Sequence, residues 1–446
     1  MKRRNFVKGV AAGVTAGFAG LRAPVVLGQA KPFAGVTING AAHQHPHHNY
    51  LMEYLPEFEA RTGMKVNFDT PAFPIYNQRV DLELSTKGSA WDFVSVTFIY
   101  SGRWIGAGWL TPLDEFTNDR NATPPDWDPR DFVDGTQSPL KDDKGMTYGF
   151  AWEAGAMMMA ASRGDLIEKA GLKMPETFAE LVQVCEAVHN KEGVAAFVAD
   201  KLHHWNWPPF LMGFGGRVFK DPPKNLTPVL DTPEAARAAE WYANLLATYC
   251  PSGVLSYTDP QAIQAQSDSR ANIRSSVISF LMPLAKNKDS KVKSTVRFAL
   301  MPGGPAGAFP GSNSNGFAIP IGAKQKRAAW EFIKWAMSKE TQRRVALEKG
   351  YAATCRRSII TDPAYREGMT LNGQDVASLY LKVLELAGKT GYMKYRTVPV
   401  FPQVGEKINK AIEVIATKQM SAEAAMKQAQ AETIADLKKA GVPLDL

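Results

Sequence analysis

Apolar residues in the stretch 311–357 change their spacing from that of a strand to that of a helix. A short apolar run at 316–321 follows a polar, glycine-rich turn and predicts a strand. One apolar stripe then recurs at helical spacing and predicts an amphipathic helix. Ser338 is placed to cap a second short helix, and Gly350 is placed to end that helix. The stripe consists of Ala329, Phe332, Ile333, Ala336 and Met337.

The N-terminal part of the chain alternates strand and helix patterns in the order of a βαβ unit. Strands are expected at 36–39, 64–68 and 91–97, and the first two flank a helix with an apolar stripe. The loops of such a unit gather at the carboxyl ends of the strands, where doubly wound sheets bind ligands. Thr97 and Phe98 end the third strand and are candidate ligand contacts for that reason.

Two stretches in the middle of the chain are expected to be loops. Residues 117–143 contain four prolines and many aspartates and asparagines, and residues 194–219 are rich in aromatic residues and glycine without a regular period. Between them, Thr177 and Glu180 form a capping box that predicts the start of a helix. The C-terminal part is helical, with a last helix expected from Ser421.

A chain of 446 residues with 45% hydrophobic and 22% charged residues is expected to form two to three globular domains. The net charge is +8, but residues 1–30 hold five basic and no acidic side chains. The rest has 47 basic and 44 acidic residues, a surplus too small for a nucleic-acid-binding surface. No nucleic-acid partner is therefore expected.

Residues 1–30 resemble a twin-arginine signal peptide, with Arg3 and Arg4 followed by a mildly apolar stretch and small residues. Arg22 and Pro24 interrupt the apolar stretch, so a membrane-spanning helix is not expected there. The mature protein is predicted to be periplasmic and exported already folded. The three cysteines, Cys185, Cys250 and Cys355, are far apart, and their spacing does not favour any disulfide.

Several motifs follow one another in the order found in a known family. A strand ends in AIP before a glycine, a lysine and AAWEFIKW, and a glycine precedes RRS. Upstream lie EFEARTGMKVNF and GWLTPLDEF, and the chain closes with SAEAAMKQAQAETIADLKKAG. Over residues 33–441 the chain thus resembles family 1 of the bacterial extracellular solute-binding proteins, the sugar-type receptors of ABC importers.

The resemblance implies an α/β, type II periplasmic-binding-protein fold. In that fold, two α/β lobes are joined by strands that cross more than once, and a ligand cleft lies between them. The first lobe is expected at 31–150 and 314–353, and the second at 151–313 and 354–446. The periodicity alone indicates only an α/β protein with two lobes.

Catalytic motifs are missing from the sequence: there is no GxSxG, HExxH, P-loop or dinucleotide fingerprint. We therefore expect a protein that is not an enzyme and needs no cofactor. A sugar site needs flat apolar faces together with fixed donors and acceptors. Trp152 and Glu153, at the first expected crossing between lobes, supply both, and Trp205, Asn206 and Trp207 are the next candidates.

Ser312, Asn313 and Asn315 lie in the glycine-rich turn at the second crossing, where they either contact ligand or serve the turn itself. Arg356 follows the third crossing and either holds a hydroxyl or acid group or forms a surface salt bridge.

Six of the seven histidines fall in two clusters, which the family architecture would bring to one cleft from opposite lobes. His43 and His45 are included as candidate ligand contacts. Neutral imidazoles also bind transition metals, so a receptor for a metal or metal complex is an alternative. The clusters are His43, His45, His47 and His48, and His203 and His204.

The sequence therefore predicts a periplasmic receptor that binds a carbohydrate or polyol and delivers it to an ABC permease. A glycerol-phosphate-type ester is a second alternative to this solute. A monomer is expected, with lobes that close on the solute.

Overall fold

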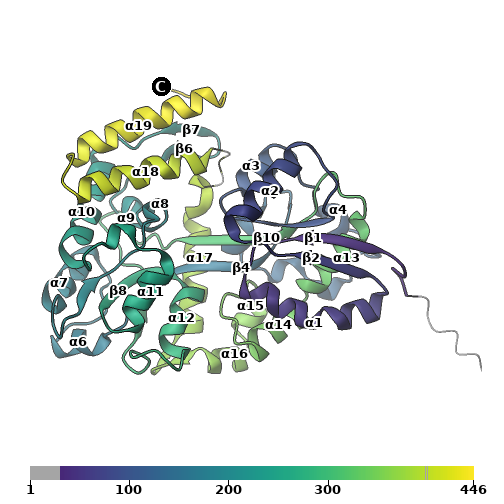
Figure 1. The fold of residues 1–446 in the computed structure, drawn as a ribbon, viewed down its shortest axis with the longest axis horizontal. Helices are drawn as coiled ribbons and strands as arrows, with labels where there is room; N and C mark the ends of the chain where they lie inside the picture. Colours follow the sequence, from purple (N-terminus) through teal and green to yellow (C-terminus); the bar gives the residue numbers. More distant parts are fainter. Residues whose placement is uncertain (1–30, 397, 399) are drawn as a thin grey trace, which may run out of the picture.

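The computed structural model describes residues 31–396, 398 and 400–446, so the predicted signal peptide lies outside the described residues. Two α/β lobes lie side by side and share one sheet, with strand order β2-β1-β3-β10-β4-β8-β5 and β9 paired to β4 (Figure 1). The strands are β1 (Thr37–Ala41), β2 (Lys65–Asp69), β3 (Phe93–Val96), β4 (Phe150–Ala161), β5 (Ala195–Phe197), β8 (Ala271–Val277), β9 (Arg297–Ala299) and β10 (Ser312–Ala318). A separate hairpin of the second lobe pairs β6 (Phe219–Asp221) with β7 (Asn225–Pro228), and a small one pairs β11 (Thr370–Leu371) with β12 (Gln374–Asp375).

Strand β4 belongs to both lobes. Its first half pairs antiparallel with β10, and its second half pairs with β8 and β9. All twelve of its residues are buried, which is typical of a strand covered on both faces. The register places Asn315 opposite Glu153 and Asn313 opposite Gly155, with an irregularity after Asn315. The side chains at this crossing are therefore fixed by the sheet itself.

The first lobe is built on the parallel strands β1, β2 and β3. β1 and β2 pair in parallel, which confirms the predicted βαβ unit. The lobe's helices include α1 (Pro46–Thr62), α2 (Phe73–Ser85), α3 (Ser101–Gly106), α13 (Lys326–Ala336) and α14 (Lys339–Glu348). As predicted, Ser338 accepts a hydrogen bond from the Thr341 backbone N–H at the start of α14, and Gly350 has a left-handed φ of 66°.

The second lobe packs helices around β5 and β8, and the predicted capping box of Thr177 and Glu180 is present at its α7. Its helices are α6 (Gly164–Lys169), α7 (Phe178–Val188), α8 (His203–Asn206), α9 (Pro208–Gly213), α10 (Pro233–Tyr249), α11 (Asp259–Ser267), α12 (Ile278–Lys286), α18 (Phe401–Ala416) and α19 (Ala422–Lys439). The last of these begins after the Ser421 cap, as expected.

Helix α17 (Val376–Thr390) runs along the seam between the lobes, behind β4 in Figure 1. The Tyr380 hydroxyl lies within hydrogen-bond distance of the carbonyls of Ala154 and Thr354. Buried residues between 359 and 384, on α15 (Arg357–Ile360), α16 (Pro363–Gly368) and α17, pack in a core cluster that joins the first lobe to α12 and β9 of the second. The predicted lobe boundaries stay a prediction.

Three expected loops are more regular than the sequence pattern indicated. Residues 312–315, expected as a turn, are part of β10, because their backbone pairs with β4 and their polar side chains find partners at the seam. Residues 203–213, expected as a loop, form α8 and α9, which have no clear period because nearly all their side chains are buried. The 117–143 stretch begins at the last residue of α4 (Asp114–Thr117) and contains the short helices η1 (Pro125–Trp127), η2 (Pro129–Asp131), α5 (Asp134–Gln137) and η3 (Ser138–Leu140).

Two chemical features of the described residues bear on the sequence analysis. Cys185, Cys250 and Cys355 are all free thiols. No helix in the described part of the chain combines the length and the apolar character that a membrane crossing requires.

Arg356 fastens the 127–131 segment to the first lobe and is fully buried. It donates to the carbonyls of Met337, Asp128 and Trp127 and pairs with the Asp131 carboxylate at 3.2 Å. Its donors are therefore occupied by structural partners.

We expect Arg356→Ala to lower the free energy of unfolding by about 3–5 kcal/mol, because the almost buried carboxylate of Asp131 loses its cation. Urea unfolding measures this change. The control is Arg357→Ala, which removes an exposed pair with Glu385 and should cost less than about 1 kcal/mol. Equal losses in the two variants would contradict a structural role for Arg356.

Candidate functional site

Glu153 is a carboxylate on β4, buried where the two lobes meet. Its Oε2 accepts a hydrogen bond from Asn315 Nδ2 at 2.7 Å, and its Oε1 lies 3.4 Å from both Ser279 Oγ on α12 and His45 Nε2. We call Glu153, Asn315, Ser279 and His45 the Glu153 cluster. Four segments that are far apart in the sequence thus converge on one carboxylate.

The orientation of His45 follows from its place at the start of α1. Its Nδ1 accepts a hydrogen bond from the His47 backbone N–H at 3.2 Å and so caps the helix. With Nδ1 used as an acceptor, the Nε2 nitrogen carries the proton and points it toward Glu153. Burial alone would raise the pKa of Glu153, but His45 and the hydrogen bond from Asn315 outweigh burial and hold that pKa well below its ordinary value.

A second group of side chains joins the Glu153 cluster to the second lobe. The Phe98 backbone N–H donates to Asn315 Oδ1 at 3.0 Å, and the Phe98 ring lies 5.8 Å from the ring of Trp205 on α8. The guanidinium of Arg396 lies over both rings, 4.2 Å from the Trp205 centroid and 5.1 Å from that of Phe98. We call Phe98, Trp205 and Arg396 the interlobe stack.

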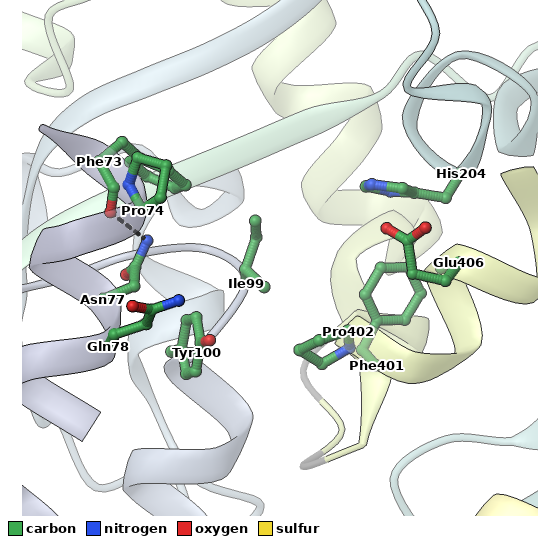
Figure 2. A pocket seen from close by; sticks show the side chains of 11 residues that line it. Phe73, Pro74, Asn77, Gln78, Ile99, Tyr100, His204, Phe401, Pro402 and Glu406 are labelled. Atoms are coloured by element: carbon green, nitrogen blue, oxygen red, sulfur yellow. Dashed lines mark hydrogen bonds between the residues drawn. The ribbon is translucent and has the colours of Figure 1, made fainter. Parts of the chain in front are cut away.

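A cavity of about 260 Å³ opens beside this stack, with one wall from each lobe (Figure 2). The first lobe supplies residues of α2 and of the segment after β3, and the second lobe supplies His204 and residues of α18. Amide, hydroxyl and imidazole groups therefore alternate with ring faces along its walls. The lining residues are Phe73, Pro74, Asn77, Gln78, Ile99, Tyr100, His204, Phe401, Pro402, Gly405 and Glu406.

Trp152, the next residue along β4 from Glu153, faces the first lobe and is fully buried. Its Nε1–H donates to Ser95 Oγ at 3.0 Å, and its ring is stacked on His47 and lies edge-on to His48. His43 completes the ring contacts around the indole. Trp152 is therefore a buried residue of the first lobe, packed among imidazoles next to the Glu153 cluster.

The imidazoles around Trp152 are neutral at physiological pH. The pKa is lowered to about 4 for His43 and to about 3 for His47. Burial is the main cause in both, and the neighbouring His45 is the second. Burial also lowers the pKa of His48 well below its ordinary value. Nitrogens of His43 and His48 are buried without a hydrogen-bond partner among the described residues.

Several residues predicted from the sequence come together in this region. Glu153, His45 and Asn315 form the core of the Glu153 cluster, and Phe98 and Trp205 belong to the interlobe stack. Next to them, the Asn313 Oδ1 atom is buried without a partner and packs against Gly155, where a Cβ would lie only 1.9 Å from it.

Other predicted residues serve their own lobe instead. Asn206 donates to the carbonyl and carboxylate of Asp200, and Trp207 is fully buried in the core of the second lobe. These two side chains point away from Trp205 because α8 is a helical turn rather than an open loop. Ser312 is buried, and its hydroxyl hydrogen-bonds only within β10.

Thr97 and Arg356 are likewise engaged elsewhere. The Thr97 hydroxyl donates to Asn77 Oδ1 at 2.8 Å, so it orients a cavity-lining amide. Arg356 is committed to the 127–131 segment described above, and the structure does not bring it to the Glu153 cluster.

The structure adds residues that the sequence reasoning missed. Arg396 is a lone arginine after a glycine and two tyrosines, and no spacing marks it. Ser279 lies in an apolar helix, and Asn77 and Gln78 lie on a helix with a weak stripe. Among these residues, only His204 could have been found from the sequence, because it belongs to a histidine pair next to two tryptophans.

The two histidine clusters do not meet. His43, His45, His47 and His48 contact one another, whereas His203 lies against Tyr242 and His204 against Phe401. In the described part of the chain, no three His, Cys, Asp or Glu side chains are arranged to hold a metal ion. The geometry therefore gives the alternative of a metal receptor no support.

Comparison with known proteins gives relatives across most of the chain. The chain is 25% identical to the mannitol-binding protein of Pseudomonas aeruginosa over 394 residues, which are 83% of this chain and 85% of that protein. It is 22% identical to the erythritol/L-threitol-binding protein of Mycolicibacterium smegmatis over 346 residues, 73% of this chain and 72% of that one.

Solved structures of ABC-transporter solute-binding proteins have the same fold. One from Agrobacterium radiobacter in complex with ribitol has a TM-score of 0.77 at 23% identity, covering 90% of this chain and 99% of that one. One from Agrobacterium vitis with bound D-mannitol has a TM-score of 0.76 at 25% identity, covering 91% and 99%. These structures confirm the predicted fold, that of a type II periplasmic binding protein.

The family model described as "Bacterial extracellular solute-binding protein" matches residues 44–343, about two thirds of the chain. That match includes β4, β10 and most of the first lobe. The family consists of exported substrate-binding proteins that work with ABC permeases. This chain belongs to the bacterial extracellular solute-binding protein family.

Proposed function

We propose that this protein is the receptor of an ABC importer and binds a carbohydrate or related polyol between its lobes. The observation that carries the proposal is the Glu153 cluster, an ionised and buried carboxylate with amide, hydroxyl and imidazole neighbours. Such a group accepts hydrogen bonds from hydroxyls, and the ring faces of the interlobe stack suit the C–H face of a polyol or sugar. The names of the relatives, which include mannitol- and erythritol-binding proteins, support this solute class.

The mechanism is a shift between open and closed forms. A solute that touches Glu153 and Asn315 at the crossing strands and Trp205 in the second lobe gains contacts only when the lobes are together. Differential affinity of this kind is what moves the equilibrium toward the closed form. The protein makes and breaks no bonds in this role, and the closed form is what the permease recognises.

The remaining parts of the proposal come from the sequence. The first 30 residues direct twin-arginine export to the periplasm, where the protein acts as a monomer. The lobes divide near 150, 313 and 353, where the chain crosses between them.

Glu153→Gln is expected to weaken solute binding by about 10- to 100-fold, because a hydrogen bond to a charged group contributes about 1.5–3 kcal/mol. Thermal-shift measurements with D-mannitol, ribitol, erythritol and maltose select the solute, and titration calorimetry then gives its Kd. Glu168→Gln is the matched control, since Glu168 is exposed and pairs with Arg297 in the second lobe. A folded Glu153→Gln protein with an unchanged Kd would remove Glu153 from the site.

The neutral imidazoles of the first lobe make the stability of the protein depend on pH. In the unfolded chain these histidines gain protons near their ordinary pKa of about 6.5. The folded protein resists protonation of His43 until about pH 4 and of His47 until about pH 3. Between these values the unfolded state binds more protons, so the free energy of unfolding falls as the pH falls from about 6.5 to about 4.

His43→Asn should remove up to about 3 kcal/mol of this pH dependence, since one pKa unit corresponds to about 1.4 kcal/mol. Urea unfolding at a series of pH values between 4 and 7 measures the effect. Asn49→Ala, an exposed substitution on α1 that changes no titratable group, should leave the slope unchanged. If both variants follow the wild-type slope, His43 is not held neutral in the folded protein.

A further inference from the structure

Three arginines are fully buried in the described part of the chain, and one of them lacks an acidic partner. Arg274 pairs with Asp200 at 2.9 Å, and Arg356 pairs with Asp131 at 3.2 Å. Among the described residues, Arg396 has no carboxylate within ion-pair distance; it hydrogen-bonds the imidazole and the carbonyl of His204 and also interacts with the Tyr395 hydroxyl. A buried charge without a counter-charge is costly, so this exception needs an explanation.

The surroundings of Arg396 compensate its charge only in part. Its guanidinium lies over the rings of Trp205 and Phe98, and its Nη2 lies 3.0 Å from Nδ1 and 3.2 Å from the carbonyl oxygen of His204. Its Nε and Nη1 are buried and have no hydrogen-bond partner among the described residues. Arginine stays protonated in proteins, so these are two charged donors without an acceptor.

Arg396 is linked to the Glu153 cluster through Phe98, because the Phe98 backbone bonds to Asn315 and the Phe98 ring lies under the guanidinium. His204, which contacts Arg396, lines the cavity in Figure 2. Glu406 lines the same cavity, but it is exposed on α18 and forms no ion pair with Arg396.

We propose that the solute is a polyhydroxy acid, whose hydroxyls contact the Glu153 cluster and whose carboxylate contacts Arg396. The site then has an acceptor group for hydroxyls and a cation for an anion. This inference rests on the proposed function, since it names the class of solute at the same site. A bound carboxylate would also supply the counter-charge that the buried guanidinium of Arg396 lacks among the described residues.

The site suits a carboxylate better than a phosphate. A phosphate monoester carries nearly two negative charges, and Arg396 is the one cation of the interlobe stack. Its neighbour His204 is neutral, because burial and then the charge of Arg396 lower the pKa of that imidazole to about 3. A single carboxylate matches the single uncompensated cation.

The test compares three probes that share one carbon chain: D-mannitol, D-mannonate and D-mannitol 1-phosphate. Titration calorimetry of the full chain should give a Kd for mannonate about 10- to 100-fold lower than that for mannitol, and lower than that for the phosphate. Arg396→Gln should bring the mannonate Kd to the mannitol value. Arg217→Gln, at an exposed arginine of the second lobe, should keep the preference for mannonate.

Each outcome decides the question. Mannitol that binds as tightly as mannonate would overturn the polyhydroxy-acid proposal and leave the proposed function standing. Tighter binding of the phosphate would overturn the choice of a carboxylate. If none of the three probes and no sugar of the thermal-shift panel binds, the proposed function fails as well. The wild-type comparison needs no variant, so it stands even if Arg396→Gln does not fold.

Discussion

The candidate site depends on one constraint: a buried carboxylate must have partners, and Glu153 finds them only where the lobes meet. Strand β4 carries Glu153 across the seam, and the antiparallel register with β10 brings Asn315 directly opposite. A one-residue slip of β10 would turn Asn315 to the other face of the sheet, away from Glu153. The sheet that joins the lobes therefore also builds the candidate site.

The same constraint explains the histidine-rich segment at the start of α1. His45 caps the helix with one ring nitrogen and points the other at Glu153, while His43, His47 and His48 pack around Trp152. The imidazoles of His43, His47 and His48 thus act as neutral groups that fill the space around the indole. From the other lobe, Trp205 and Arg396 contact Phe98 across the seam.

Sequence patterns were most informative where one local rule decides the structure. The βαβ unit, the Ser338 cap and the Thr177 capping box were predicted because periodicity and capping are local. The first half of β10, residues 312–315, was mistaken for a turn because its polar residues have partners only in the assembled sheet. Trp152 was predicted at the crossing, but the sequence did not show which face of the sheet its ring would take. All the residues of β4 are buried, so no alternation of polar and apolar residues marks the two faces.

Arg396 could not be predicted from the sequence for the same reason. The lack of a carboxylate near its guanidinium is a property of the folded chain and leaves no pattern in the sequence.

The measurement that tests this account most directly is a crystal structure of the protein with D-mannitol bound. The account predicts the polyol between the lobes, with hydroxyls within hydrogen-bond distance of Glu153 and Asn315 and with its carbon chain against Trp205. A polyol bound elsewhere, such as in the cavity of the second lobe beside Arg217 and Tyr395, would contradict it.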